Sequence, residues 1–148
     1  MSRELNLVTS LHTATKRDYL GRMNDSKAEA MMIAKQYGAD YWDGDRKYGY
    51  GGYKYIPGRW ATVAQKLIQL YGLKAGSKVL DVGCGYGWLL DYFEGAEKLA
   101  GVDIAHHAVE VAAKRKPARH FKQGNLEQPI PFDETFDLVL AINIIEHL

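Results

Sequence analysis

The sequence predicts a doubly wound α/β fold, in which βαβ units build a parallel sheet, and two observations support this prediction. Short apolar runs alternate with helical patterns from Lys78 onward. A glycine-rich turn directly follows the first apolar run and precedes a helical pattern, as in sheets that bind nucleotides at their strand ends. The 148 residues are 47% hydrophobic and 25% charged, which is enough apolar material for one globular core.

Composition excludes several classes of function. Lys and Arg number 19 against 18 Asp and Glu, and a formal charge of +1 argues against a polycationic nucleic-acid surface. Cys84 is the single cysteine, so we expect neither a disulfide framework nor a metal site. Charges interrupt the first twenty residues, and the longest apolar stretch, Leu138–Ile145, is far shorter than the ~20 residues that a bilayer requires. We therefore expect a cytoplasmic protein without membrane or nucleic-acid partners.

Residues 1–77 are predicted to form an N-terminal helical cap with a Tyr/Gly-rich part. Apolar spacing predicts helices over Lys27–Tyr37 and Arg59–Tyr71, and Gly38 and Gly72 are their expected ends. Between them lies what we call the aromatic segment, residues 37–60, where tyrosine and tryptophan alternate with glycine and favour irregular backbone. Two interpretations stand side by side: the segment packs a cap against the sheet, or it walls a substrate cavity with its tyrosines, among them Tyr48, Tyr50, Tyr53 and Tyr55.

Residues 78–148 are predicted to form the core of the fold. Helical patterns lie near Trp88–Glu94 and Ala105–Lys116, and a further helix is expected to begin at Ile144. Between and around them the pattern predicts four strands, at Lys78–Val82, Leu99–Ile104, Arg119–Lys122 and Phe136–Ile142.

The glycine-rich turn places Gly83, Gly85 and Gly87 at alternate positions after the first strand. Glycine permits a sharp turn and lets a ligand approach the backbone, and the following helix is expected to offer free N–H groups at its start. A dinucleotide fingerprint beginning at Gly83 needs glycine where Trp88 stands, so that form is excluded. Asp81, two residues before Gly83, disfavours a pyrophosphate and suits a cationic ligand.

A second acidic residue is predicted to lie close to this turn. Asp103 ends the next predicted strand, 22 residues after Asp81. At that position, a carboxylate can accept hydrogen bonds from the ribose hydroxyls of a nucleoside in the crevice.

Val79–Gly87 resembles the first motif of the class I S-adenosylmethionine-dependent methyltransferases, and residues 78–148 carry the rest of the resemblance, to a Rossmann-like domain. The resemblance implies S-adenosyl-L-methionine as cofactor. It implies that Asp81 and the backbone at the three glycines surround the methionine part, with Cys84 among them, that Asp103 holds the ribose, and that Ile104 flanks the adenine.

Later segments resemble the family's next motifs. Gly124–Glu127 is similar to a Gly-Asp-Ala-Glu segment that contacts the adenine edge, which implies this role for Asn125 and the amide of Leu126. Asn125 stands where the family usually has Asp, and its carbonyl can still accept from the adenine amino group. Phe136–Leu148 resembles the fourth strand and the Glu-His-Leu that follows it, and Asn143 in this segment is a further implied cofactor contact.

The resemblance implies transfer of a methyl group to a small-molecule or glycan-type acceptor. His147 is the candidate general base by family position, and its alternative is a histidine that only starts a helix. Tyr50, Tyr53 and Tyr55 are the candidate acceptor-binding residues. Two other functions stay open: a non-catalytic module that binds S-adenosylmethionine, and, on the shared fold alone, a nicotinamide-dependent oxidoreductase.

The number of predicted strands departs from the family, whose complete domain has a seven-stranded sheet. Four strands leave the last one at an open edge that needs cover. Three explanations fit: the chain is part of a longer protein, a second copy completes the sheet as a homo-oligomer, or residues 1–77 fold across the edge. We favour the first, an incomplete domain.

Overall fold

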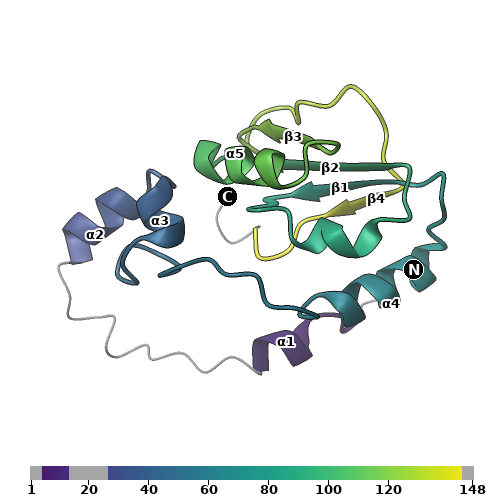
Figure 1. Ribbon diagram of the computed structural model, residues 1–148, viewed down its shortest axis with the longest axis horizontal. Helices are drawn as coiled ribbons and strands as arrows, with labels where there is room; N and C mark the ends of the chain where they lie inside the picture. Colours follow the sequence, from purple (N-terminus) through teal and green to yellow (C-terminus); the bar gives the residue numbers. More distant parts are fainter. Residues whose placement is uncertain (1–4, 14–26, 145–148) are drawn as a thin grey trace.

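The computed structural model describes residues 5–13 and 27–144. Their centre is one parallel sheet with the strand order β3-β2-β1-β4 (Figure 1). In register, Val79 lies opposite Leu99 on one side and Leu138 on the other. The predicted α/β fold is therefore confirmed, and its strands are β1 (Lys78–Val82), β2 (Lys98–Asp103), β3 (His120–Gln123) and β4 (Leu138–Leu140).

The helices precede and connect the strands. Gly72 ends the helix before β1 as predicted: its φ is 61°, and its N–H donates to the carbonyl of Ile68. Two single-turn helices near the N-terminus were not predicted, because five residues are too few to show a helical period. The described helices are α1 (Thr9–Thr13), α2 (Lys27–Ala34), α3 (Ala39–Asp43), α4 (Ala61–Tyr71), the 3₁₀ helix η2 (Leu89–Phe93) and α5 (His106–Arg115).

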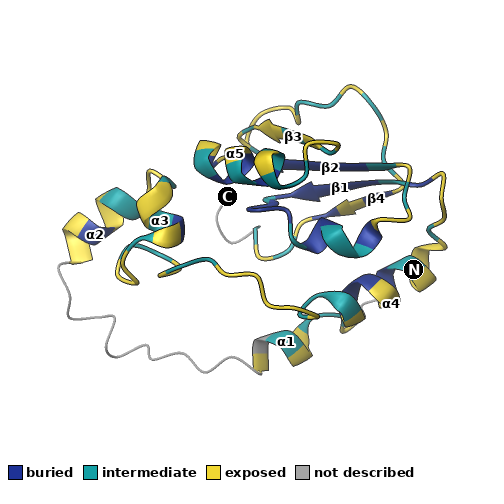
Figure 2. Ribbon diagram, viewed as in Figure 1, coloured by how far each residue is buried: buried dark blue, intermediate teal, exposed yellow. Residues whose placement is uncertain are grey.

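One face of the sheet carries the larger core. Alternation along a strand puts Val79 and Asp81 on the same face, and their register partners put Leu99 there too. Helices α4 and η2 cover this face with apolar side chains, while α5 packs beside them along β2 and β3. Strands β1 and β2 are the most buried part of the sheet (Figure 2). Around Val79 and Leu99, the core of this face comprises Val63, Ala64, Leu67, Leu89, Leu90, Phe93, Leu138 and Leu140.

The opposite face is covered differently. Leu80, Val82, Ala100 and Val102 form its buried centre, and of the described residues those that pack on it come from the connection between β3 and β4. Val139 belongs to this face by its register with Leu80 and is 53% exposed. In the described part of the chain, helices therefore pack on the face of Val79, and a loop connection packs on the face of Leu80.

The predicted α-helix over Trp88–Glu94 is wrong in type. The chain forms the 3₁₀ helix η2 instead, and the N–H of Asp91 donates to the carbonyl of Trp88. The carbonyl of Tyr86, just before this helix, accepts Nε and a terminal nitrogen of Arg115, at 3.2 and 3.1 Å, so α5 is bonded to the turn after the glycines.

The last strand is shorter than predicted. Pairing with β1 stops at Leu140, and Asn143 has a left-handed φ of 55°, which no strand residue adopts. Ile144 is not helical, and the rest of the predicted final helix lies outside the described residues. No helix in the described ranges is long and apolar enough to cross a bilayer.

Candidate active site

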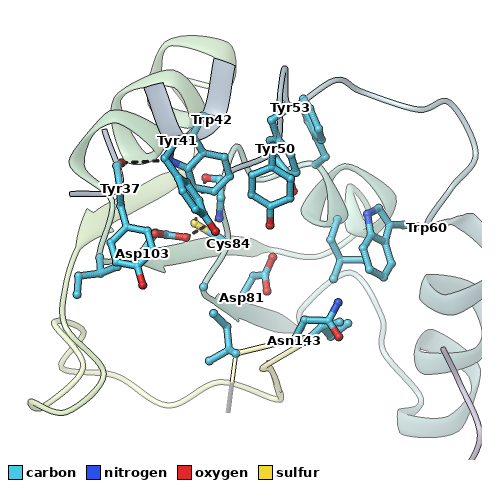
Figure 3. A pocket seen from close by; sticks show the side chains of 17 residues that line it. Tyr37, Tyr41, Trp42, Tyr50, Tyr53, Trp60, Asp81, Cys84, Asp103 and Asn143 are labelled. Carbon is cyan, nitrogen blue, oxygen red and sulfur yellow. Dashed lines mark hydrogen bonds between the residues drawn. The ribbon is translucent and has the colours of Figure 1, made fainter. Parts of the chain in front are cut away.

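Two adjoining cavities lie where β1 and β2 end. The first has a volume of about 170 Å³ and lies between the glycine loop and the aromatic segment (Figure 3). The second, of about 150 Å³, extends to the turn after β3. Because the two share five lining residues, they form one continuous groove; these residues are Tyr37, Gly83, Asp103, Ile104 and Ile144.

Asp81 supplies a buried carboxyl to the first cavity. Its side chain lies on the face of β1 that carries the larger core. The residue is 5% exposed and accepts no hydrogen bond from the described residues. Burial, together with the charge of nearby Asp103, raises the pKa of Asp81 to about 8. A buried acid without a donor is costly for the fold, and a cationic or hydrogen-bonding ligand would remove that cost.

Asp103 is held firmly at the end of β2. One carboxylate oxygen accepts the N–H of Gly85 at 2.8 Å, and the other accepts the N–H of Ala105 at 2.9 Å. Burial raises the pKa of Asp103, although these backbone hydrogen bonds oppose the shift. Each oxygen retains a lone pair toward the groove, so the carboxylate can accept two hydroxyl groups in a fixed orientation.

The glycine loop, residues 83–87, uses its amides internally. Gly83 and Cys84 both donate to the carbonyl of Val102, Gly85 donates to Asp103, and Gly87 donates back to Cys84. These four amides come before the helix η2, so the expectation that its start offers free N–H groups concerns other amides and stays a prediction. Gly83 and Gly85 have left-handed φ values of 73° and 52°, and a Cβ would collide with the side chain of Ile144 at the first and press on that of Trp42 at the second, so glycine is needed at both positions.

The aromatic segment covers this loop. Trp42 is 5% exposed and stacks on Tyr86 with ring centroids 5.1 Å apart, and Tyr53 stacks on Trp88 at 4.4 Å. Burial raises the pKa of Tyr41 to about 12 and that of Tyr53 further, so both remain neutral donors. The rings of the segment both pack on the core and wall the first cavity, and a role of its tyrosines in binding a substrate stays a prediction (Figure 3).

The structure gathers most of the predicted site residues. The first cavity is lined by Asp81, Gly83, Cys84, Gly85, Asp103, Ile104 and Asn143, and by two of the predicted substrate tyrosines, Tyr50 and Tyr53. The second is lined by Asn125 and Leu126. In the described ranges, no cluster of His, Cys, Asp and Glu has the geometry of a metal site.

Two predicted site residues line neither cavity, and a third is not among the described residues. Gly87 packs near Phe121, and Tyr55 pairs its hydroxyl with that of Tyr92 at 3.2 Å, so neither lines a cavity. His147 lies outside the described residues.

The first cavity is also lined by residues that the sequence analysis did not name as site residues. Their common signal is an apolar or aromatic side chain close in sequence to a predicted site residue; they are Tyr37, Tyr41, Trp42, Trp60, Trp88, Leu89, Ile142 and Ile144.

Several known proteins similar to this chain are methyltransferases. Residues 80–148 match a family described as a methyltransferase domain. Over 124 residues, the chain is 31% identical to the ubiquinone biosynthesis O-methyltransferase of Azorhizobium caulinodans, covering 75% of this chain and 48% of that protein. A TehB-like S-adenosylmethionine-dependent methyltransferase from Corynebacterium glutamicum has a similar structure, with a TM-score of 0.50 and 27% identity over 57% of this chain and 47% of that one. Residues 80–148 belong to a class I methyltransferase domain.

The methyltransferase domain is matched by relatives of different kinds. Over 87 residues, the chain is 42% identical to the ribosomal protein L11 methyltransferase of Dictyoglomus thermophilum, covering 55% of this chain and 28% of that protein. The chain spans about half or less of the length of the curated relatives it matches.

S-adenosylmethionine is the cofactor of class I methyltransferases, and the groove of this domain fits it. The cofactor is a cation with a free amine, a ribose and an adenine. The groove presents a buried acid, Asp81, to which no described residue donates, a fixed carboxylate in Asp103, and a half-exposed apolar side chain in Ile104.

Proposed function

We propose that this chain binds S-adenosylmethionine along the groove, and that the protein containing it transfers the methyl group to a small-molecule or glycan-type acceptor. One observation carries the proposal. Asp81 is a buried carboxyl that faces the first cavity, accepts no hydrogen bond from the described residues, and lies beside a second buried carboxyl. A positively charged, hydrogen-bonding ligand is what this pair lacks.

The methionine end belongs in the first cavity. Its ammonium group donates to Asp81, and the backbone of Gly83, Cys84 and Gly85 lies against its chain, since all three residues line this cavity. Asn143 lines the same cavity and offers an amide from the opposite wall.

The adenosine end belongs in the second cavity. Asp103 accepts the ribose hydroxyls, and the side chain of Ile104, which is 47% exposed, lies flat against the adenine. Asn125 and Leu126 line the far end of this cavity. The carbonyl oxygen of Asn125 accepts the N–H of Glu127 at 3.0 Å and has a second lone pair for the adenine amino group.

The chain's own contribution to the reaction is alignment and exclusion of water. The cofactor supplies a methyl group on a positively charged sulfur. Tyr50 and Tyr53, with Trp42 and Trp60, wall the cavity from the N-terminal side, which supports a role for residues 1–77 as a cap and for these tyrosines in holding the acceptor. For an acceptor hydroxyl we assign His147, on sequence alone, as general base.

The test has two stages. Calorimetric titration of the chain with S-adenosylhomocysteine reports on the groove without an acceptor, and we expect micromolar binding. Absence of binding in a sample that melts cooperatively would refute the cofactor assignment. The full-length protein is then incubated with labelled S-adenosylmethionine and a panel of phenols, sugars and ribosomal proteins. Labelling of the proteins alone would refute the proposed acceptor class, and no turnover of any acceptor would favour a binding module.

A further inference from the structure

A polar cluster fastens the aromatic segment to the glycine loop and to α5. The hydroxyl of Tyr86 donates to Oδ2 of Asp43 at 2.6 Å. Nε2 of His107 lies 3.2 Å from the same hydroxyl and 3.6 Å from the same carboxylate oxygen. Asp43 belongs to α3, Tyr86 to the loop and His107 to the first turn of α5, so three separate parts of the chain meet at one point.

Asp43 also organises the segment itself. Its other carboxylate oxygen, Oδ1, accepts the N–H of Tyr53 at 3.4 Å, while Oδ2 binds the core. The neighbouring residue, Trp42, stacks on the ring of Tyr86 and contacts Tyr53 edge to face at 4.9 Å. A single carboxylate thus holds the segment folded back on itself and attached to the loop.

The cluster lies outside the groove. None of Asp43, Tyr86 and His107 lines either cavity. A ligand in the groove would therefore not touch the cluster, and we expect the cluster to keep the same contacts when the groove is filled. Trp42 and Tyr53, which the cluster places, do line the first cavity and lie over Gly85. The cluster can act on a ligand only by holding or releasing the segment.

The strength of the cluster suits reversible opening. The side chain of Asp43 is 52% exposed and that of His107 is 29% exposed, so water competes for their hydrogen bonds. A bond of this kind shifts an open–closed equilibrium by about tenfold and does not lock it.

We propose that Asp43, Tyr86 and His107 form a latch of positioning residues, which closes the aromatic segment over the groove and so limits how fast the cofactor enters and leaves. This role rests on the proposed function. A latch that is equally strong around an empty and a filled groove slows both steps by the same factor. It therefore changes the association and dissociation rate constants together and leaves their ratio, Kd, unchanged.

The experiment compares Tyr86→Phe with the unmodified chain. The substitution removes the hydroxyl but keeps the ring that stacks on Trp42. S-adenosylhomocysteine is mixed with each protein in a stopped-flow fluorimeter, and tryptophan fluorescence follows binding, because Trp42, Trp60 and Trp88 line the first cavity. We expect both rate constants to rise about tenfold, with Kd changed less than about threefold. Tyr71→Phe, an exposed tyrosine on α4, is the matched control, for which both rate constants should stay as they are.

A second variant and a second measurement isolate the latch. Asp43→Asn keeps the size of the side chain and removes its charge, and the double variant with Tyr86→Phe should be no faster than the faster single variant, because both changes break one bond. Hydrogen exchange needs no ligand: the N–H groups of Tyr50 and Gly52, which bond to the carbonyls of Tyr41 and Trp42, should exchange about tenfold faster in either variant.

The outcomes separate the two proposals. Unchanged rate constants in both variants, with normal binding by the unmodified chain, would overturn the latch and leave the proposed function intact. A rise in Kd through dissociation alone would also overturn it, because the cluster would then act on the bound state only. Failure of the folded, unmodified chain to bind S-adenosylhomocysteine would overturn the proposed function, and the latch's role toward the cofactor with it.

Discussion

Replacing Asp81 by asparagine should stabilise the protein and weaken cofactor binding at the same time. Asparagine has nearly the same shape but carries no charge and no titrating proton. Asp81 is buried at the end of β1, with a pKa raised to about 8 by burial and by Asp103. The substitution therefore removes both the cost of this acid in the fold and its attraction for an ammonium group.

The effect on stability follows from the two pKa values of Asp81. The carboxyl has a pKa of about 3.9 in the unfolded chain and about 8 in the folded one, so the folded protein holds a proton that unfolding releases. Raising the pH therefore favours unfolding throughout that window. Between pH 6 and pH 7.5 this group lowers the free energy of unfolding by about 2 kcal/mol, and Asp81→Asn should remove that part of the pH dependence.

The effect on affinity has the opposite sign. An ammonium group binds the ionised form of Asp81, so at pH 6 the protein must first lose a proton from a group whose pKa is about 8. Affinity for S-adenosylhomocysteine should rise about 25-fold from pH 6 to pH 7.5 in the unmodified protein, with proton release on binding. In the variant this rise should disappear, and the loss of a charged hydrogen bond should cost about 1.5–3 kcal/mol at the higher pH.

Thermal melts and calorimetric titrations at the two pH values test both effects. The quantity to compare is the melting temperature of the variant minus that of the unmodified protein. We expect this difference to be about 4–8 °C larger at pH 7.5 than at pH 6. Calorimetry in two buffers of different ionisation enthalpy measures the released proton. Asp133→Asn, an exposed acid outside both cavities, is the control. A variant that melts lower than the unmodified protein at pH 7.5 and binds the ligand equally well would refute the reasoning.

Three further substitutions test other parts of the structure. Asp103→Ala leaves ribose hydroxyls without a partner and should weaken S-adenosylhomocysteine binding by about 1–3 kcal/mol in calorimetry; equal affinity would remove Asp103 from the site. Leu90→Ala empties a fully buried position and should cost about 2–5 kcal/mol in urea unfolding, whereas a loss below 1 kcal/mol would mean that the core collapses around it. Burial alone would raise the pKa of Asp91, but Arg115 and Arg119 hold it below its ordinary value, so its stabilising effect is present above the unfolded pKa and is lost as the pH falls through the folded one. Asp91→Asn should therefore flatten the fall in melting temperature between pH 5 and pH 3, and an unaltered acid profile would contradict the ion pairs.

The strand–loop unit at the centre of the site could be predicted from the sequence. Strand β1 has the predicted bounds, because an apolar run meets a glycine turn at Gly83 without ambiguity. That Asp81 and Asp103 line the same cavity could be predicted in the same way, since adjacent parallel strands end at the same edge of a sheet. Both features depend on residues that are close together in one βαβ unit.

Features that depend on distant residues could not be predicted. The turn before η2 is bonded to Arg115, which lies 29 residues after the Tyr86 carbonyl to which it donates. His107 lies close to Asp43, which comes from a segment without periodicity. The regular spacing of the three glycines also predicts the same role for each of them. Gly87 instead lies near Phe121, outside the two cavities. A one-dimensional pattern contains no information on such contacts.

The closed hydrogen bonding of the glycine loop bears on how the protein distinguishes metabolites that share an adenosine. ATP and the nicotinamide dinucleotides carry phosphates next to the ribose, and proteins that hold such phosphates present unused N–H groups to them. In this loop the amides of Gly83, Cys84, Gly85 and Gly87 are all committed to protein oxygens. A phosphate placed there would lie close to the carboxylate of Asp103 and would find none of these four amides free. We therefore expect the loop to disfavour the abundant phosphorylated adenosines without any steric barrier.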